Sequence, residues 1–361
     1  MPLQPAELQP QAAAVHGRIH QTVVILGARG RLGYCCVQAF AQAGWHVLAH
    51  VRANSVMHHQ EVPDSQVRWI ATDLEDAKTW QTLAHQAGGI DVVVNAMAPK
   101  FSVTVWAKEL VALTQQGTRL AQQLQALLIH PLSVLACGTQ IPEIWRENNA
   151  LPSVPDNRLG KLRWATEVQL AQAAAEGVSV CTLRTGTFYG HHGWGWISSA
   201  VAKDVRKGIV HGLGPYNVVT PWAYVPDVAE TMVRIAEHKQ RLIGWTQLHF
   251  AGHAVTGEDW AQALEAVCQT KGWIGPEDTV LRDRVHWWMW KPAAWFSTVV
   301  RALSEMEYVW RTPHRLDNTQ LKALIGPEPH TPWRTSVAQT VDLLERREDL
   351  HGGLTRTHQA Y

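Results

Sequence analysis

The chain has 361 residues, and its 32 lysines and arginines against 31 aspartates and glutamates give a formal net charge of +1. This balance, without a basic run or stripe, argues against nucleic-acid binding, and the lack of a run of about 18 apolar residues argues against a membrane-spanning helix. The five cysteines are odd in number and show no metal-ligand spacing, which argues against a disulfide framework and a metal site. We therefore expect a cytoplasmic protein, with residues 1–20 as a flexible tail that lacks the apolar centre of a signal peptide.

The first predicted element is a strand that runs into a glycine-rich turn. Val23–Leu26 are four apolar residues in a row, typical of a strand buried on both faces. Gly27, Gly30 and Gly33 follow, and a helix is predicted over 34–43. In a dinucleotide fold the first glycine permits a tight turn, the second lets the backbone approach the pyrophosphate, and the third lets helix and strand pack closely. The helix N-terminus offers free N–H groups to the anion.

A second strand, predicted over 45–51, ends at Arg52, nineteen residues after Gly33. At this place a dinucleotide fold has an acid for a free ribose 2′-hydroxyl or a cation for a 2′-phosphate. The chain has Arg52 and no acid nearby, and Arg29 and Arg31 add positive charge in the loop. Guanidinium groups suit bidentate phosphate binding, so the sequence favours NADP over NAD. The alternative is that Arg52 is only a solvated strand end.

Strands and helices then alternate. A third strand over 67–74 ends in Asp73 and Leu74, which can hold an adenine, and a helix follows over 75–85. A fourth strand over 90–98 runs into small residues that let a cofactor lie against the backbone. Next come one long helix over 101–129, a fifth strand over 132–137, a helix over 158–176 and a sixth strand over 178–183. This alternation predicts an α/β fold with a doubly wound parallel sheet.

Five segments carry the pattern of a known family. They are Gly27-Ala28-Arg29-Gly30-Arg31-Leu32-Gly33, Asp73-Leu74, Asp91-Val92-Val93-Val94-Asn95-Ala96, Leu183-Arg184-Thr185-Gly186-Thr187-Phe188-Tyr189-Gly190 and Trp222-Ala223-Tyr224-Val225-Pro226-Asp227-Val228-Ala229. In order and spacing they resemble the extended or atypical short-chain dehydrogenases/reductases, the group of NAD(P)-dependent epimerase and dehydratase relatives. The resemblance covers about residues 20–260.

The resemblance implies that a nicotinamide dinucleotide lies over the glycine loop and that the segment from Arg184 to Gly190 flanks the nicotinamide. The candidate cofactor contacts are Gly27, Ala28, Arg29, Gly30, Arg31, Leu32, Gly33, Arg52, Asp73, Leu74, Asn95, Ala96, Met97, Thr185 and Gly186.

After Gly190 the regular alternation ends. Helices are predicted over 194–207 and 228–238, a short strand over 247–250, and a capping box from Thr256 to Asp259 before a helix over 260–268. We expect residues 21–190, completed by 218–251, to form the dinucleotide-binding domain. Residues 191–217 and 252–361 then form a smaller, mostly helical substrate lobe over the carboxyl ends of the strands.

The expected catalytic pair is missing. Relatives that transfer hydride use a tyrosine and, four residues later, a lysine that lowers the phenol pKa. The matching positions here are Leu159 and Arg163, and leucine carries no proton. Arg163 could lie under the nicotinamide ribose or be a helix-face charge. Relatives also place a hydroxyl after the fifth strand, where only Thr139 could serve, one place out of register; Cys137 is a small apolar residue there.

Other groups could replace the tyrosine as the proton donor. Tyr189 is a candidate in the segment that flanks the nicotinamide, Tyr224 lies in the later family segment, and His191 and His192 follow Gly190. Each also has a plain structural interpretation, because such tyrosines often pack in a core and paired loop histidines are often solvated. The weak catalytic candidates are thus Thr139, Arg163 and Tyr189.

Three functions remain open. The first, which we favour because the substrate lobe has its full length, is an NADP-dependent oxidoreductase or isomerase acting on a small carbonyl or sugar-like substrate. The second is a non-catalytic NADP-binding sensor or regulatory protein. The third uses the tryptophans near residue 290 as a membrane-surface anchor, although a lobe core or a pocket lid fits that segment better. A homodimer could form through Leu110, Leu113 and Leu120, which could equally face the sheet.

Overall fold

The protein is built around a seven-stranded parallel sheet. In a computed structural model, residues 21–52, 65–148, 152–190, 195–290, 295 and 298–351 are described. The strand order is β11-β7-β5-β4-β1-β2-β3, and every pair is parallel. The strands are β1 (Thr22–Leu26), β2 (His46–Val51), β3 (Val67–Ala71), β4 (Val92–Asn95), β5 (Leu127–Ser133), β7 (Val180–Thr185) and β11 (Trp245–His249). This confirms the predicted doubly wound fold.

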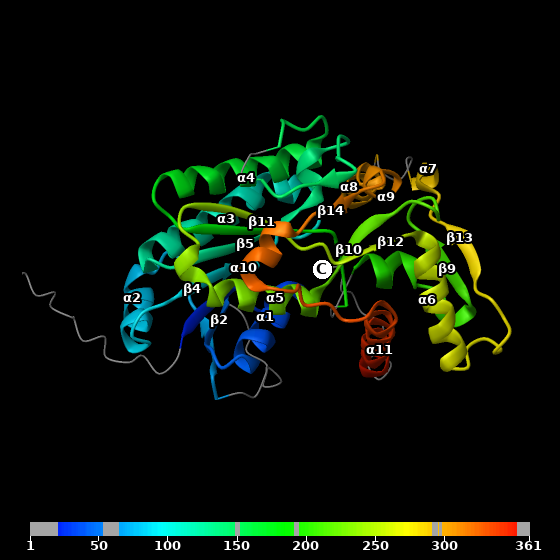
Figure 1. Cartoon of the computed structure of the whole chain (residues 1–361), viewed down its shortest axis with the longest axis horizontal. Helices are drawn as coiled ribbons and strands as arrows, with labels where there is room; N and C mark the ends of the chain where they lie inside the picture. The colour runs from blue at the N-terminus through cyan, green and yellow to red at the C-terminus, as the bar shows by residue number, and fades with distance from the viewer. Residues whose placement is uncertain are drawn as a thin grey trace, which may run out of the picture.

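Helices cover both faces of the sheet (Figure 1). On one side α1 (Arg31–Gln42) packs against α5 (Val225–Glu237). On the other side lie α2 (Ala77–Gln86), α3 (Val103–Leu124) and α4 (Arg158–Ala175). Strand β1 shows why both faces are needed, because Val23 and Ile25 join the core cluster on the α1 side while Val24 and Leu26 join the one on the α3 side.

The predicted boundary between the long helix and the fifth strand is wrong. Helix α3 ends at Leu124, not near 129, because Gln125 adopts a left-handed conformation with φ of 52°. The apolar run from Leu127 to Ile129 is the buried start of β5, which ends at Ser133. Such a run fits a buried strand and a helix equally well. Residues Val134–Cys137, predicted as strand, form a 3-10 turn, η1.

The remaining helices and strands lie beside the sheet (Figure 1). Most belong to residues 191–217 and 252–361, the predicted substrate lobe, but β6, β8 and β10 fall in the ranges predicted for the dinucleotide-binding domain. Helices are present as predicted, together with small sheets that the sequence did not indicate. The sheets join β12, β10 and β8, then β13 and β9, then β14 and β6. The elements are β6 (Ile144–Trp145), β8 (Thr187–Tyr189), β9 (Ile209–Gly212), β10 (Thr220–Tyr224), β12 (His253–Val255), β13 (Leu281–Arg284), β14 (Arg315–Leu316), α6 (Gly257–Thr270), α7 (Trp287–Trp290), α8 (Thr298–Glu305), α9 (Glu307–Arg311), α10 (Thr319–Ile325) and α11 (Trp333–His351).

Two local predictions for the lobe have opposite outcomes. The capping box is confirmed, since the Thr256 hydroxyl accepts from the Asp259 N–H and the Asp259 carboxylate accepts from the Thr256 N–H at 2.8 Å. The helix predicted over 194–207 is wrong for the described residues, which form only short turns, η2 (Ile197–Val201) and η3 (Val205–Lys207). There the Ser199 hydroxyl donates to the Gly195 carbonyl at 2.6 Å, a local bond that competes with regular helix.

The C-terminal chain does not stay within the lobe. Leu321 of α10 belongs to the same core cluster as β1 and α5, so this helix returns to the sheet. Helix α10 thus packs against the sheet, although residues 252–361 were predicted to form the substrate lobe. The division of the chain at residue 251 remains a prediction.

The tryptophan-rich segment is only partly buried. Trp287 is buried and its indole N–H donates to the Leu213 carbonyl at 2.8 Å, as a lobe core requires. Trp288, Met289 and Trp295 are exposed, which contradicts a core role for these three side chains.

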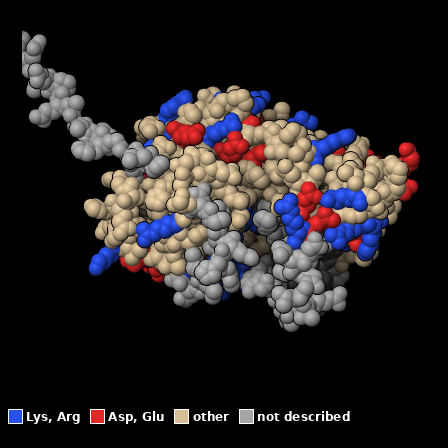
Figure 2. All heavy atoms as spheres, turned by 90° about the horizontal axis from the view of Figure 1, so that it is seen from below, with Lys and Arg blue, Asp and Glu red and all other residues tan. Residues whose placement is uncertain are grey.

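The helix α3 leucines named for a dimer contact are largely used inside the subunit. Leu110 and Leu120 are buried in its core and Leu113 is half-buried, so a homodimer remains a prediction. In the part of the chain that the structure describes, no helix combines the length and apolarity needed to cross a membrane. The five cysteines are free thiols, and Figure 2 shows acidic and basic side chains interspersed over one face.

Buried histidines make the fold sensitive to acid. His249 in β11 is buried, and burial is the main reason why its pKa falls to about 3. Between the unfolded value near 6.5 and this pKa, only the unfolded chain takes up the proton, so stability is lost as the pH falls. We expect a loss of about 2 kcal/mol at pH 5 from this residue. Chemical denaturation of the His249→Gln variant should show a flatter pH dependence than the wild type.

His85→Gln, which removes one histidine from the exposed surface of α2, supplies the matched control for the substitution itself. Equal slopes for the wild type and His249→Gln would show that His249 is protonated in the folded state as readily as in the unfolded one.

Candidate dinucleotide-binding site

The sheet has one place where its strand order reverses, between β1 and β4. Ligands of open α/β sheets bind in the crevice at such a point. Gly27 follows β1 with φ of +72°, and a Cβ there would lie 2.9 Å from the Ala96 carbonyl oxygen after β4. A Cβ at Gly33 would collide with the Gly27 carbonyl oxygen. Both positions therefore require glycine, for the reasons that the sequence suggested.

The start of α1 suits an anion. Its N-cap is Gly30, which has no side chain, so no side-chain cap occupies the first-turn N–H groups. The turn is held by backbone bonds, from the Gly30 N–H to the Gly27 carbonyl and from the Tyr34 N–H to the Gly30 carbonyl, both at 2.8 Å. Leu32, the second residue of α1, is buried in the core on the α1 side of the sheet. A pyrophosphate would meet backbone N–H groups and the positive end of the helix dipole.

The side of the crevice next to β2 is basic. Arg29, Arg31 and Arg52 are all exposed around the ends of β1 and β2. The Ala28 N–H donates to the His50 carbonyl at 3.2 Å, which ties the glycine loop to β2 just before Arg52. An anion bound beside the end of β2 would therefore lie near exposed guanidinium groups.

Two further predicted contacts follow β3. The exposed Asp73 carboxylate accepts from the Glu75 N–H at 3.0 Å, and its carbonyl accepts from the Trp80 indole N–H at 3.2 Å. Leu74 is half-buried against the α3 side of the core. Both residues lie one strand beyond β2, where an adenine would end.

The side chains of some predicted cofactor contacts form hydrogen bonds with the chain's own backbone. The buried Asn95 donates to the Leu113 carbonyl at 3.2 Å and accepts from the Met97 N–H at 3.3 Å, so it shapes the turn through Ala96. The Thr185 hydroxyl donates to the Leu132 carbonyl at 3.2 Å. A Cβ at Gly186 would collide with the Pro221 carbonyl oxygen. Any contact from Asn95 or Thr185 to a dinucleotide would come from the main chain.

Helix α4 carries no proton donor at the two expected positions. Leu159 is buried in the core cluster that α3 and the lobe share. The Arg163 guanidinium lies 4.2 Å from the centre of the Trp106 ring, and burial lowers the pKa of Arg163 to about 10, so it stays charged near neutrality. Its buried Nε has no hydrogen-bond partner in the described part of the chain. Arg163 of α4 is thus a cation held against Trp106 of α3, not an acid or a base.

Thr139 is also poorly placed for chemistry. It is exposed, its N–H donates to Asp156 at 2.9 Å, and its hydroxyl is bonded to the same carboxylate. The hydroxyl that sequence reasoning missed is Ser133, the last residue of β5, whose Oγ accepts from the Leu135 N–H at 3.2 Å. Ser133 was missed because the fifth strand was predicted over 132–137 and not over 127–133. The apolar run from Leu127 to Ile129 was the signal that could have placed the strand correctly.

The tyrosines serve the lobe core. Tyr189 is buried, and its hydroxyl lies 2.7 Å from Ser336 Oγ of α11. Aromatic rings, including those of Trp260 and Trp333, surround it, and burial raises its pKa. Tyr224 donates to Gln339 at 2.6 Å, and burial raises its pKa to about 12. Neither tyrosine is set up to release a proton near neutrality. His191 and His192 lie outside the described residues.

A buried ion pair joins the carboxyl ends of β5 and β7 to α4. Arg184 donates to both oxygens of Glu167 at 2.9 and 2.8 Å, and to the Ser133 carbonyl at 2.8 Å. Its guanidinium also lies 3.9 Å from the centre of the Trp145 ring. Both charged side chains are about 1% exposed. The family segment that begins in β7 thus contributes a structural cation at the carboxyl end of this strand.

Comparisons with known proteins place this site in context. The family described as "NAD dependent epimerase/dehydratase family" matches residues 23–244. No curated protein matches the chain in sequence. Similar solved structures include the UDP-glucuronic acid 4-epimerase from Bacillus cereus in complex with NAD. It is 16% identical, with a TM-score of 0.67, and the match covers 90% of this chain and 99% of that one.

Two other complexes are similar to the same extent. The enzyme WbmH from Bordetella bronchiseptica with NAD+ is 15% identical with a TM-score of 0.66, over 91% of this chain and 99% of that one. The dTDP-glucose 4,6-dehydratase from Bacillus anthracis with NAD is 12% identical with a TM-score of 0.65, over 93% and 100%. At these identities the likeness concerns the fold.

Proposed function

Because the chain belongs to the NAD dependent epimerase/dehydratase family, we propose that it binds NADP between β1 and β4 and reduces a small carbonyl compound. The observation that carries the proposal is the glycine cradle at Gly27 and Gly33 with Arg52 at the end of β2. The similar structures named above hold NAD, so the choice of NADP rests on the arginines of this chain alone. An arginine after the second strand suits a 2′-phosphate, and an acid would suit a free hydroxyl.

The missing proton-transfer group bears on which reaction the site supports. Oxidation or epimerisation of an alcohol requires a group that removes the hydroxyl proton. Leu159 cannot do so, and Arg163 stays charged near neutrality. Reduction passes through the same transition state, so the missing group slows both directions alike, and the net direction is set by the coenzyme supplied: NADPH would give the hydride and water the proton. Epimerisation needs both an oxidation and a reduction at one carbon, so the missing group acts on it twice. The described residues therefore fit a slow reductase better than an epimerase.

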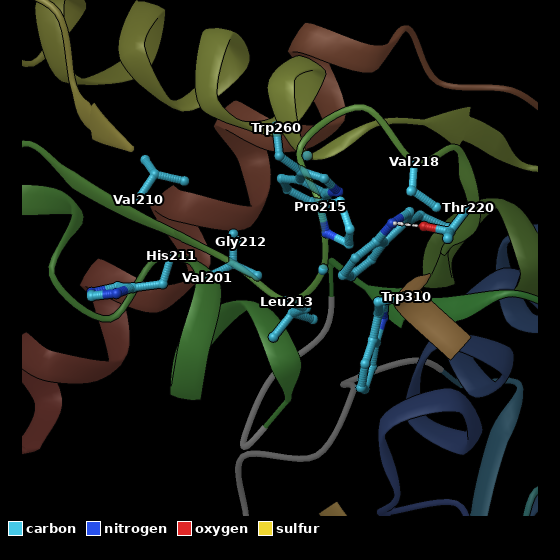
Figure 3. A pocket seen from close by; sticks show the side chains of 13 residues that line it. Val201, Val210, His211, Gly212, Leu213, Pro215, Val218, Thr220, Trp260 and Trp310 are labelled. Atoms are coloured by element: carbon cyan, nitrogen blue, oxygen red, sulfur yellow. Dashed lines mark hydrogen bonds between the residues drawn. The ribbon is translucent and has the colours of Figure 1, made fainter. Parts of the chain in front are cut away.

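The leucine at position 159, where relatives have the catalytic tyrosine, also favours a second function. A protein that only senses NADP needs no proton donor, and Leu159 fills the core where the tyrosine would stand. The substrate lobe argues against this alternative, because its residues pack around a small pocket of their own (Figure 3).

Loss of NADPH absorbance with a panel of aldehydes, ketones and quinones separates the two functions. We expect slow reduction of at least one carbonyl compound and no epimerisation of UDP-glucose. Tight NADPH binding without turnover across the panel would favour the sensor.

Two variants test the catalytic candidates in the same assay. Thr139→Ala and Tyr189→Phe should both keep turnover within about twofold, because neither hydroxyl takes part in proton transfer. A loss of about a hundredfold in Tyr189→Phe, with the fold intact by circular dichroism, would make Tyr189 the proton donor.

A further inference from the structure

Arg163 lies near the candidate dinucleotide crevice. Its helix, α4, packs beside α3 on one face of the sheet (Figure 1). Strand β5 pairs with β4, with Ile129 beside Val94, so His130 follows next to Asn95 at the end of β4. The charge of Arg163 adds to burial in lowering the pKa of His130 to about 3. Arg163 is therefore close to β5, the strand next to the one that borders the crevice.

The guanidinium of Arg163 has nitrogens that reach open space. Among the described residues none donates to, accepts from or forms an ion pair with any of its three nitrogens. Only Nε is fully buried, and the residue as a whole is half-buried. The two terminal nitrogens are thus accessible. The Trp106 ring, 4.2 Å away, attracts the cation through its face but accepts no N–H hydrogen bond in the plane of the guanidinium.

The charges around Arg163 do not balance. Glu167, one turn further along α4, is the carboxylate that faces it. Both oxygens of Glu167 already accept from Arg184, at 2.9 and 2.8 Å. His130 is neutral near neutral pH, because its pKa is about 3. Two positive charges therefore share one negative charge in a largely buried cluster, and buried charges in proteins are normally paired. One anionic charge would complete the cluster.

The coenzyme is a poor source of this charge. Its pyrophosphate would meet the glycine loop after β1, and the nicotinamide ring of NADPH carries no negative charge. The substrate is the remaining ligand of the proposed reductase. A carboxylate carries the single charge that balances the cluster, and its two oxygens match the terminal nitrogens of a guanidinium. A phosphate monoester carries nearly two charges and fits the balance less well.

We propose that Arg163 binds the carboxylate of the substrate through its two terminal nitrogens. The substrate class is then a carbonyl compound with a carboxylate, such as a 2-oxo acid. Its keto carbon would take up the hydride from NADPH and its keto oxygen a proton from water, giving the 2-hydroxy acid and NADP. The reaction rests on the proposed function, but binding of the carboxylate requires no coenzyme. Failure of either therefore leaves the other standing.

Calorimetric titration of the full chain without coenzyme tests the ligand class with three probes. The first is benzoylformate, the second is benzoylformamide, which has nearly the same shape but no charge, and the third is phenyl phosphate. We expect benzoylformate to bind about 10- to 100-fold more tightly than benzoylformamide, the ratio that a hydrogen bond between charged groups supplies. Phenyl phosphate should bind more weakly than benzoylformate.

Three results would overturn the carboxylate assignment. They are equal binding of the keto acid and the keto amide, no binding of benzoylformate, and binding of phenyl phosphate as tight as that of benzoylformate. Reduction of neutral ketones by NADPH alongside any of them would keep the proposed reductase and reject the carboxylate site.

Variants on α4 locate the contact. Arg163→Gln keeps N–H donors but removes the charge, so its affinity for benzoylformate should fall to about that for benzoylformamide. Arg163→Lys keeps the charge and loses the paired nitrogens, so its affinity should lie between those of the wild type and Arg163→Gln. Arg158→Gln is the matched control, since Arg158 is exposed in the first turn of the same helix.

The control should bind benzoylformate within about twofold of the wild type, and circular dichroism confirms that each variant is folded. An equal loss in Arg158→Gln, or wild-type affinity in both Arg163 variants, would contradict the role of Arg163. A fall in NADPH affinity in Arg163→Gln without a fall in benzoylformate affinity would also contradict it, because the guanidinium would then contact the coenzyme.

Discussion

Replacing Arg52 by alanine is expected to weaken NADPH binding by about 10- to 100-fold and to leave NADH binding within about twofold. A guanidinium and a phosphate form charge-assisted hydrogen bonds that are about twice as strong as neutral ones, and Arg52 stands exposed directly after β2. Only NADPH carries the 2′-phosphate, so only its affinity should fall. Titration of both coenzymes by protein fluorescence, at one fixed salt concentration, gives the two ratios.

The matched control is Arg68→Ala. This residue is also exposed, but it lies near the start of β3 and donates to Gln86 at 3.0 Å. Its loss changes the net charge by the same amount without touching the crevice. An equal fall for NADPH in both variants would assign the effect to general electrostatics. A parallel fall for NADPH and NADH in Arg52→Ala would place Arg52 away from the 2′-phosphate.

Replacing Glu167 by leucine is expected to lower the free energy of unfolding by about 3–5 kcal/mol, because it leaves the Arg184 charge buried without its carboxylate. Arg184 cannot relax into solvent, since Trp145 covers its guanidinium and the Ser133 carbonyl holds one nitrogen. Denaturant unfolding followed by circular dichroism measures the change.

The double variant Glu167→Leu/Arg184→Met should recover most of this loss, because two apolar side chains leave no unpaired charge. Glu307→Ala, which breaks the exposed pair with Arg311 on α9, should cost less than about 1 kcal/mol. A double variant as unstable as Glu167→Leu alone would show that packing, not charge, dominates this site.

The crevice could be predicted from sequence because local rules determine it. Gly27 and Gly33 adjoin backbone that is fixed by the neighbouring strands, so no other residue fits and the glycine spacing marks the site. The alternation of strands and helices then gave the sheet. Ser133 was not predicted as a site residue because the apolar run from Leu127 fits a helix and a strand equally well. The end of the preceding helix depends on one residue, Gln125, in a left-handed conformation.

The small pocket of the substrate lobe could not be predicted, because distant segments build it. Val201, Val218, Trp260 and Trp310 belong to separate elements, and nothing local in the sequence shows that they meet. Tyr189 shows the same limit, since its environment is set by Ser336 and Trp333 from the far end of the chain. The sequence identified Tyr189 as a candidate proton donor, whereas the folded chain buries it in the core.

The central claim is that the first strands of the sheet bind a phosphorylated dinucleotide. The most direct measurement is calorimetric titration of the full chain with NADPH and, separately, with NADH. The account predicts saturable binding of NADPH, at least about tenfold tighter than that of NADH. Binding of neither coenzyme, or tighter binding of NADH, would contradict it.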